Sequence, residues 1–137
     1  MFSLGFILTF AAAANNDYSV TVGDHTIHYN TFNSSTLQPN IAKAFGIPRS
    51  NKIAVLNVVV KKGRKDSAQA SVSATATNLN GQMRTINMRK VIDGSAIYYI
   101  GDFRFSNEET LKFNIKVTPQ GQDRATEIKF SRQFFPG

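Results

Sequence analysis

The sequence predicts an all-β protein, an antiparallel, immunoglobulin-like β-sandwich of seven or eight strands with one short helical insertion. Three observations predict this fold. Apolar and polar residues alternate with a period of two along much of the chain, turn signals recur about every ten residues, and one short segment has helical spacing.

The clearest alternation lies near the C-terminal end. In residues 110–117 every second residue is apolar, and Lys112 and Lys116 stand between the apolar positions. A turn signal, TPQG, follows at residues 118–121, and the alternation resumes in residues 126–131, where Lys129 is polar-facing. This pattern is typical of antiparallel strands with one face in the core and the other in water.

A hairpin signal and an apolar run predict three further strands in the N-terminal half of the chain. Residues 18–22 and 25–29 flank Gly23-Asp24, a two-residue hairpin signal. The nearly continuous apolar run IAVLNVVV at residues 53–60 predicts a central strand covered on both faces. The hairpin register places on one face the pairs Val22 with His25, Val20 with Ile27 and Tyr18 with Tyr29.

The hairpin signal Asn80-Gly81 fits its flanks less well. A two-residue loop there would place Ile86 opposite Thr75, but it would also place Val72 opposite Arg89. Either the loop is longer than two residues, or the strands on its two sides part into different sheets. The sequence leaves both alternatives open.

The helical insertion is predicted near residues 37–45. Thr36 is the expected cap, Pro39 lies in the first turn, and Gly46 ends the helix. About two turns of helix are too short to persist in isolation, so packing must hold them. Four residues around this insertion are candidates for the lining of a groove, with a place in the core as the default: Tyr29, Phe32, Leu37 and Phe45.

Residues 1–14 predict a secretory signal peptide. They carry no charge, and an apolar run ends in four alanines that offer an A-x-A cleavage pattern. The run is shorter than the roughly 20 apolar residues that span a bilayer. Residues 15–137 are then expected to form a single β-sandwich domain in the periplasm. The competing interpretation is a buried element of a cytosolic protein.

Charge and cysteine content narrow the expected partners. The formal net charge is +7 and the chain has no cysteine, which excludes thiol catalysis and thiolate metal sites. Outside the cytoplasm, the natural partners of a basic protein are anionic lipids, polymers and acidic proteins. One loop concentrates cations and is a candidate anion-binding loop: Lys61, Lys62, Arg64 and Lys65.

No catalytic, cofactor-binding or metal-ligating residue is predicted. His25 and His28 have H-x-x-H spacing, but residues three apart in a strand point to opposite faces, so they are expected to be two half-exposed strand residues. Glu108 and Glu109 are expected to serve the turn in which they lie. The isolated glycines do not make a phosphate-cradling loop.

Three stretches resemble a known family. They are residues 28–60 (HYNTFNSSTLQPNIAKAFGIPRSNKIAVLNVVV), 76–82 (ATNLNGQ) and 96–119 (AIYYIGDFRFSNEETLKFNIKVTP). Together they resemble the small secreted proteins of Gram-negative bacteria grouped as domain of unknown function 4426. The resemblance implies a periplasmic, single-domain, sandwich-like protein. It implies no activity and supplies no catalytic residues.

The leading functional hypothesis is a non-enzymatic periplasmic module that contacts an anionic envelope polymer, lipid or protein through its basic loops. The alternative is a hydrolase of unrecognised type that uses His25 or His28. A minor alternative is nucleic-acid binding, which requires a cytoplasmic location and exposed stacking aromatics.

Overall fold

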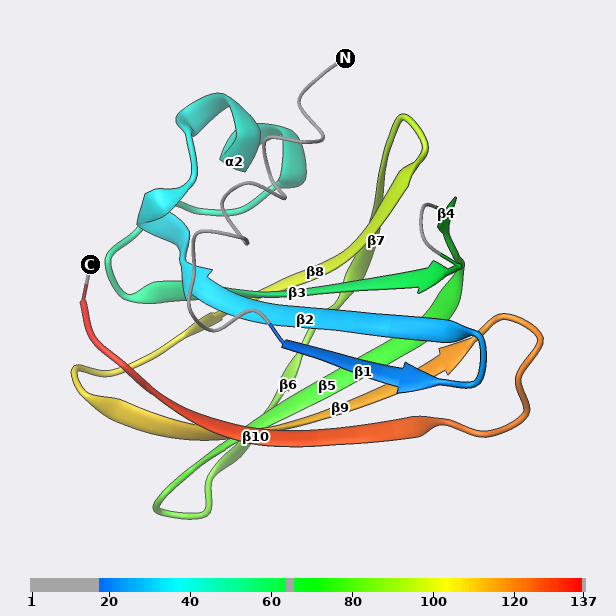
Figure 1. Ribbon diagram of the computed structural model, residues 1–137. Coiled ribbons are helices and arrows are strands. Elements are labelled where there is room, and N and C mark those ends of the chain that lie inside the picture. Colours follow the sequence, from blue (N-terminus) through cyan, green and yellow to red (C-terminus); the bar gives the residue numbers. More distant parts are fainter. Residues whose placement is uncertain (1–17, 64–65, 137) are drawn as a thin grey trace.

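A computed structural model describes residues 18–63 and 66–136, which form two antiparallel sheets and a short helix (Figure 1). Sheet A has the strand order β1-β2-β3-β8-β7, with β4 beside β3, and sheet B has the order β10-β9-β5-β6. The strands of sheet A are β1 (Tyr18–Val22), β2 (His25–Asn33), β3 (Ile53–Lys62), β4 (Asp66–Ser67), β7 (Arg89–Asp93) and β8 (Ala96–Arg104). Those of sheet B are β5 (Ala70–Asn78), β6 (Met83–Ile86), β9 (Glu109–Pro119) and β10 (Thr126–Phe134). The helices η1 (Ser34–Thr36) and α2 (Pro39–Phe45) separate β2 from β3.

The architecture confirms the predicted all-β sandwich. The described residues contain ten strands rather than the seven or eight expected. One of the additional strands is β4, which has two residues. Another arises because residues 83–93 do not form one strand but are divided between β6 in sheet B and β7 in sheet A.

The main core lies between the two sheets. In β9 the alternating apolar residues are all buried, and their lysine neighbours are exposed, as the period of two predicts. The aromatic rings of Phe103, Phe113 and Phe134 contact one another edge-on inside this core, with centroids 5.4 to 5.9 Å apart. Burial of this apolar surface is the main force that holds the sheets together.

A second, smaller core lies on the outer face of sheet A, beneath α2 (Figure 1). Residues 53–60 of β3 are therefore buried on both faces, as predicted for this run. Asn57 is the polar member of the run, and its Nδ2 donates a 3.4 Å hydrogen bond to Oδ1 of Asn30, its partner in β2. A slip of one residue would separate this pair, so it favours the observed register. The buried members of the second core are Leu37, Ile41, Ala42, Ile47, Val55, Val59, Tyr98 and Ile100.

The helix forms where the sequence predicts it, but its start differs. Gln38 is the N-cap and makes no side-chain capping bond, and Pro39 is the first helical residue. Thr36, the expected cap, belongs to η1 and donates through Oγ1 to the carbonyl of Asn33. Gly46 ends the helix in a left-handed conformation at φ 70°, which glycine adopts without steric cost.

The aromatic and apolar residues around the insertion lie in the two cores or pack against them. Leu37 is fully buried, and Phe32 and Phe45 pack against the second core. Tyr29 lies on the opposite face of sheet A, in the main core, where its ring contacts Phe130. The default interpretation of these residues, a place in the core, is confirmed: α2 and sheet A enclose three of them, and Tyr29 lies between the two sheets.

The first hairpin has the predicted register, with Val20 opposite Ile27 and Tyr18 opposite Tyr29. At Asn80-Gly81 both alternatives left open by the sequence are correct: the loop is longer than two residues, and the strand segments after it part into different sheets. The pairing of Thr77 with Met83 makes the loop longer than two residues, and the chain then leaves sheet B after β6 to form β7 in sheet A. Arg89 therefore never faces Val72, which instead pairs with Val117 of β9.

Polar contacts also join the two layers. Nη1 of Arg132 in β10 donates to the carbonyl and to Oγ1 of Thr31 in β2, each at 2.6 Å. The hydroxyl of Tyr99 in β8 accepts a 2.8 Å bond from the backbone N–H of Ala70 in β5. These bonds connect sheet A with sheet B at two separate places.

Residues 1–14, the predicted signal peptide, lie outside the described residues. Among the residues that are described, no helix has the length and apolarity needed to cross a membrane.

We predict that Gly101→Ala destabilises the fold by about 1–3 kcal/mol, the usual cost of overpacking. A Cβ at this position would lie 2.6 Å from Cγ2 of Ile86 and 3.0 Å from the carbonyl oxygen of Asn87, where the chain crosses between the sheets. Urea unfolding measures the change. Ser95→Ala, in an exposed turn, is the control, and an unfolding midpoint of Gly101→Ala equal to that of the control would contradict the close approach.

We also predict that stability falls as the pH rises from 10 to about 12. Burial, with a smaller contribution from Asp93, raises the pKa of Tyr98 to about 12, whereas its ordinary value is 10.0. A raised folded-state pKa gives stability that is complete below the unfolded-state pKa and is lost as the pH climbs toward the folded-state pKa. Urea unfolding across this range should show a shallower loss for Tyr98→Phe, and an unchanged slope would contradict the assignment.

Candidate functional site

The two histidines do not form a common site. His25 and His28 lie on opposite faces of β2, as the sequence predicts. His25 is 4% exposed, which corrects the expectation of a half-exposed residue, because its side chain turns toward the main core. Its Nδ1 is 3.1 Å from Oδ1 of Asp24, although the two atoms are not aligned for a hydrogen bond.

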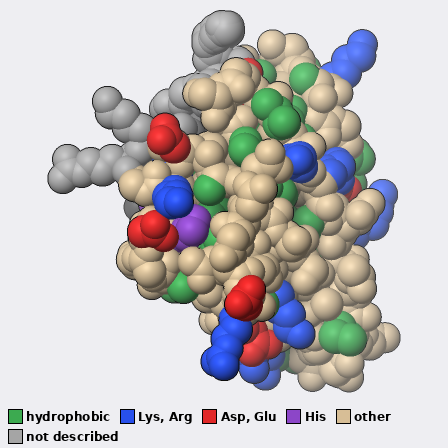
Figure 2. Space-filling model, turned by 90° about the vertical axis from the view of Figure 1, so that its right-hand side faces the viewer, with side chains coloured by type: hydrophobic (Ala, Val, Ile, Leu, Met, Phe, Trp, Pro, Cys, Tyr) green, Lys and Arg blue, Asp and Glu red, His purple; other side chains and the backbone are tan. Residues whose placement is uncertain are grey.

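The candidate anion-binding loop is described only in part. Lys61 and Lys62 end β3, whereas Arg64 and Lys65 lie outside the described residues. Nζ of Lys62 is 3.9 Å from the carboxylate of Asp24, and Asp66 of β4 is its register partner. Figure 2 views this end of the molecule and shows acidic side chains beside basic ones. The described part of the loop is thus an alternation of opposite charges rather than a purely basic surface.

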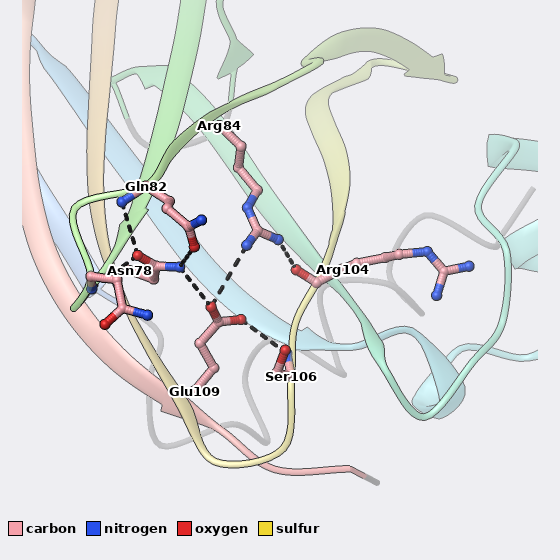
Figure 3. A network of polar contacts seen from close by, with 7 residues as sticks. Asn78, Gln82, Arg84, Arg104, Ser106 and Glu109 are labelled. Carbon is pink, nitrogen blue, oxygen red and sulfur yellow. Dashed lines mark hydrogen bonds and ion pairs between the residues drawn. The ribbon is translucent and has the colours of Figure 1, made fainter.

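A polar network centred on Asn78 fixes the turn between β5 and β6 (Figure 3). The Oδ1 atom of this buried residue accepts bonds from the backbone N–H groups of Asn80, at 3.0 Å, and Gln82, at 2.9 Å. Its Nδ2 donates to Oε1 of Gln82 at 2.8 Å and to Oε2 of Glu109 at 3.3 Å. One amide side chain thereby closes the turn and attaches it to β9.

Glu109 extends this network to sheet A. Its Oε1 accepts a 2.9 Å bond from the backbone N–H of Ser106, which confirms the predicted turn role, and its Oε2 lies 3.7 Å from Nη2 of Arg84. Arg84 in turn donates to the carbonyl of Arg104, at the end of β8 (Figure 3). Because the polar atoms of Asn78 and Glu109 are used within the protein, we assign the Asn78 network to rigidity rather than to chemistry.

The outer face of sheet B forms a basic, hydroxyl-rich surface. The strand register brings Lys112 and Lys116 of β9 and Lys129 of β10 together, and all three are exposed. Serines and threonines of β5 lie opposite the β9 residues on the same face. We call this surface the basic face: Lys112, Lys116 and Lys129 with Ser71, Ser73, Thr75, Thr77, Asn114 and Ser131.

A shallow, open groove of about 440 Å³ lies within the basic face. Residues of three strands line it, two of them phenylalanines and the others polar: Thr77, Lys112, Phe113, Asn114, Lys129, Phe130 and Ser131. Nδ2 of Asn114 donates a 2.8 Å bond to Oε2 of Glu127. This bond, together with the positive charges of Lys129 and Lys116, lowers the pKa of the Glu127 carboxyl. The groove can therefore attract an anion, with Glu127 as a competing negative charge at its side.

Sequence reasoning located the three lysines on a solvated face but did not assign them to a site. Positive charge also guards an edge strand against pairing with another chain, an explanation that fits Lys129 on the edge strand β10 but not Lys112 and Lys116 on the interior strand β9. The groove itself depends on the offset between β9 and β10, which pairs Lys129 with Asn114 and Ser131 with Lys112. The alternation of polar and apolar residues within one strand does not show which residue of the neighbouring strand lies opposite.

Residues 19–137 match the family described as a domain of unknown function (DUF4426). The chain belongs to this family. A crystal structure of a DUF4426 family protein from Pseudomonas aeruginosa has 38% sequence identity and a TM-score of 0.80, and the match covers 89% of this chain and 97% of that one. The family resemblance read from the sequence is thereby confirmed. No curated protein matches the sequence significantly.

More distant structures share the fold of this DUF4426 chain. FetP of uropathogenic Escherichia coli, expressed in the periplasm, has 9% identity and a TM-score of 0.62 over 88% of this chain and 94% of that one. A copper-bound single-residue variant of FetP has 9% identity and a TM-score of 0.64 over 88% and 95%. In the DUF4426 chain, the described residues contain no group of three or more His, Cys, Asp or Glu side chains arranged to hold a metal ion.

We predict that Asn78→Ala lowers the free energy of unfolding by about 2 kcal/mol or more, because it leaves two turn N–H groups without their acceptor. Asn80→Ala is the matched control, since the network uses only the backbone of Asn80 and an exposed substitution typically changes stability by less than about 0.5 kcal/mol. Urea unfolding compares the two variants, and equal stabilities would contradict the structural role of the Asn78 network.

Proposed function

We propose that this protein is a non-enzymatic binding module of the Gram-negative periplasm and that its basic face binds an anionic component of the cell envelope. The observation that carries the proposal is the convergence of Lys112 and Lys129 on a groove also lined by the hydroxyl-bearing residues Thr77 and Ser131. Ammonium and hydroxyl groups together suit phosphate or carboxylate oxygens, which accept both charge-assisted and neutral hydrogen bonds.

The spacing of the lysines favours an extended anionic surface over one small anion. Lys112 and Lys116 are four residues apart on one strand, and Lys129 lies opposite Asn114, midway between them. With a strand rise of about 3.4 Å per residue and a strand separation of about 4.8 Å, neighbouring lysine positions are roughly 8 Å apart. Three cations in such a zigzag can contact successive anionic groups of a polymer or of a layer of lipid headgroups.

The basic loop remains a second contact in this proposal. Lys61 and Lys62 supply positive charge, but Asp24 and Asp66 lie beside them and offset it. The acidic neighbours reduce the net positive charge that these two lysines present to an anion, and an exposed ion pair of this kind adds little interaction energy. We therefore place the principal site on the basic face and treat the loop, with Arg64 and Lys65, as an auxiliary attraction.

The periplasmic location is also part of the proposal. It is supported by the signal-like pattern of residues 1–14 and by the fold shared with FetP, which was expressed in the periplasm of Escherichia coli. Membrane surfaces that face this compartment carry anionic lipid headgroups, and a net charge of +7 draws the protein toward them.

We predict that the double variant Lys112→Glu and Lys129→Glu binds purified lipopolysaccharide roughly thirtyfold more weakly or worse. The estimate takes about 1 kcal/mol for each of the two basic residues lost from an anionic surface, or about 2 kcal/mol in total, and the two added negative charges weaken binding further. Isothermal titration calorimetry at low and high salt measures the loss. Glu127→Gln removes the competing carboxylate and should strengthen binding.

The matched control is Lys61→Glu with Lys62→Glu, which changes the net charge by the same amount. An equal loss in both double variants would mean that only net charge matters, and a larger loss in the control would move the site to the loop. If the unaltered protein binds neither lipopolysaccharide nor phosphatidylglycerol vesicles at low salt, the proposed function is overturned.

A further inference from the structure

Two exposed apolar side chains stand at one end of the basic face. Met83 of β6 is 69% exposed and Leu79, in the turn between β5 and β6, is 70% exposed. Figure 1 shows this turn projecting at the bottom of the molecule, away from α2. Large apolar side chains that project into water at the tip of a hairpin are candidates for contact with an apolar partner.

The register places this apolar pair in line with the basic face. Met83 pairs with Thr77, and Thr77 pairs with Lys112, which in turn pairs with Ser131. These residues form one row across β6, β5, β9 and β10. Because paired residues share a face of the sheet, the side chain of Met83 lies on the same outer face as Lys112. The surface thus passes from apolar to basic within a few residues.

The turn that carries Leu79 is held in place. Asn78 accepts from the N–H groups of Asn80 and Gln82 and donates to Glu109, while Arg84 links the same glutamate to the end of β8 (Figure 3). The backbone on both sides of Leu79 is therefore fixed before any partner arrives. A preorganised apolar tip loses less conformational entropy on binding than a mobile loop would.

We infer that Leu79 and Met83 are an apolar anchor that enters the headgroup region of an anionic phospholipid membrane while Lys112 and Lys129 contact the lipid phosphates. This inference rests on the proposed function and specifies its partner as a membrane surface. A soluble polyanion can contact only the lysines. A lipid layer can contact the lysines through its phosphates and can also bury the two apolar side chains at the boundary between its headgroups and its acyl chains. Charge and apolar burial act together in such peripheral binding.

The test uses the protein and vesicles of phosphatidylcholine with and without phosphatidylglycerol, assayed by co-sedimentation. Leu79→Ser with Met83→Ser should weaken binding to the anionic vesicles roughly tenfold or more, because it removes two apolar side chains from the contact. The control is Ile92→Ser, a somewhat less exposed apolar residue (61%) on β7 of sheet A, which should leave binding unchanged. Thermal unfolding of each variant verifies that it folds.

A spectroscopic variant reports the depth of the contact. The chain contains no tryptophan, so Leu79→Trp introduces a single tryptophan at the turn, which is excited selectively over the four tyrosines. Its fluorescence should shift to shorter wavelength on anionic vesicles and stay unchanged with a soluble polyphosphate chain. An unshifted spectrum on vesicles that bind the protein would overturn the anchor.

The outcomes separate the inference from the function on which it rests. Vesicle binding that is equal in the serine variant and the control overturns the apolar anchor and leaves the anion-binding function standing. Binding to polyphosphate without binding to vesicles would likewise overturn the apolar anchor and leave the anion-binding function standing. Failure to bind either probe overturns both proposals.

Discussion

The fold depends on the burial of β3 on both faces. Its inner residues face sheet B, and its outer residues Val55 and Val59 require a second cover, which α2 supplies. A seven-residue helix has little stability in isolation, so its position comes from contacts with the sheet. Arg89 contributes by donating to the carbonyls of Phe45 and Gly46 and to the carboxylate of Asp102. The helix and the sheet therefore stabilise each other.

This arrangement determines which surface is available for binding. The helix covers part of the outer face of sheet A, whereas polar side chains cover the outer face of sheet B. The lysines there stand on rigid, paired strands, because β9 is hydrogen-bonded to β5 on one side and to β10 on the other. A charged surface on such strands keeps its spacing, and fixed spacing favours partners with regularly placed anionic groups.

Individual strands, the first hairpin and the end of the helix could be predicted because each depends on residues that are neighbours in the sequence. Alternation in β9, the Gly23-Asp24 hairpin and the end of α2 at Gly46 each depend on residues close together in the chain. The division of residues 83–93 between two sheets depends on Gly101, which lies further along the chain and whose lack of a side chain lets the crossing segment approach. The Asn78 network and the groove at Lys112 and Lys129 likewise require pairings between distant strands. Periodicity within a segment carries no information about such pairings.

The contact of Arg132 with Thr31 joins residues that are 101 positions apart, near the two ends of the domain. This contact between the two sheets can form only after the last strand, β10, has been synthesised. Contacts of such long sequence separation form late and slow the folding of β-proteins. The two sheets are therefore joined at this point only once nearly all of the described residues have been synthesised, so the sandwich closes after synthesis of β10 rather than during the synthesis of the earlier strands.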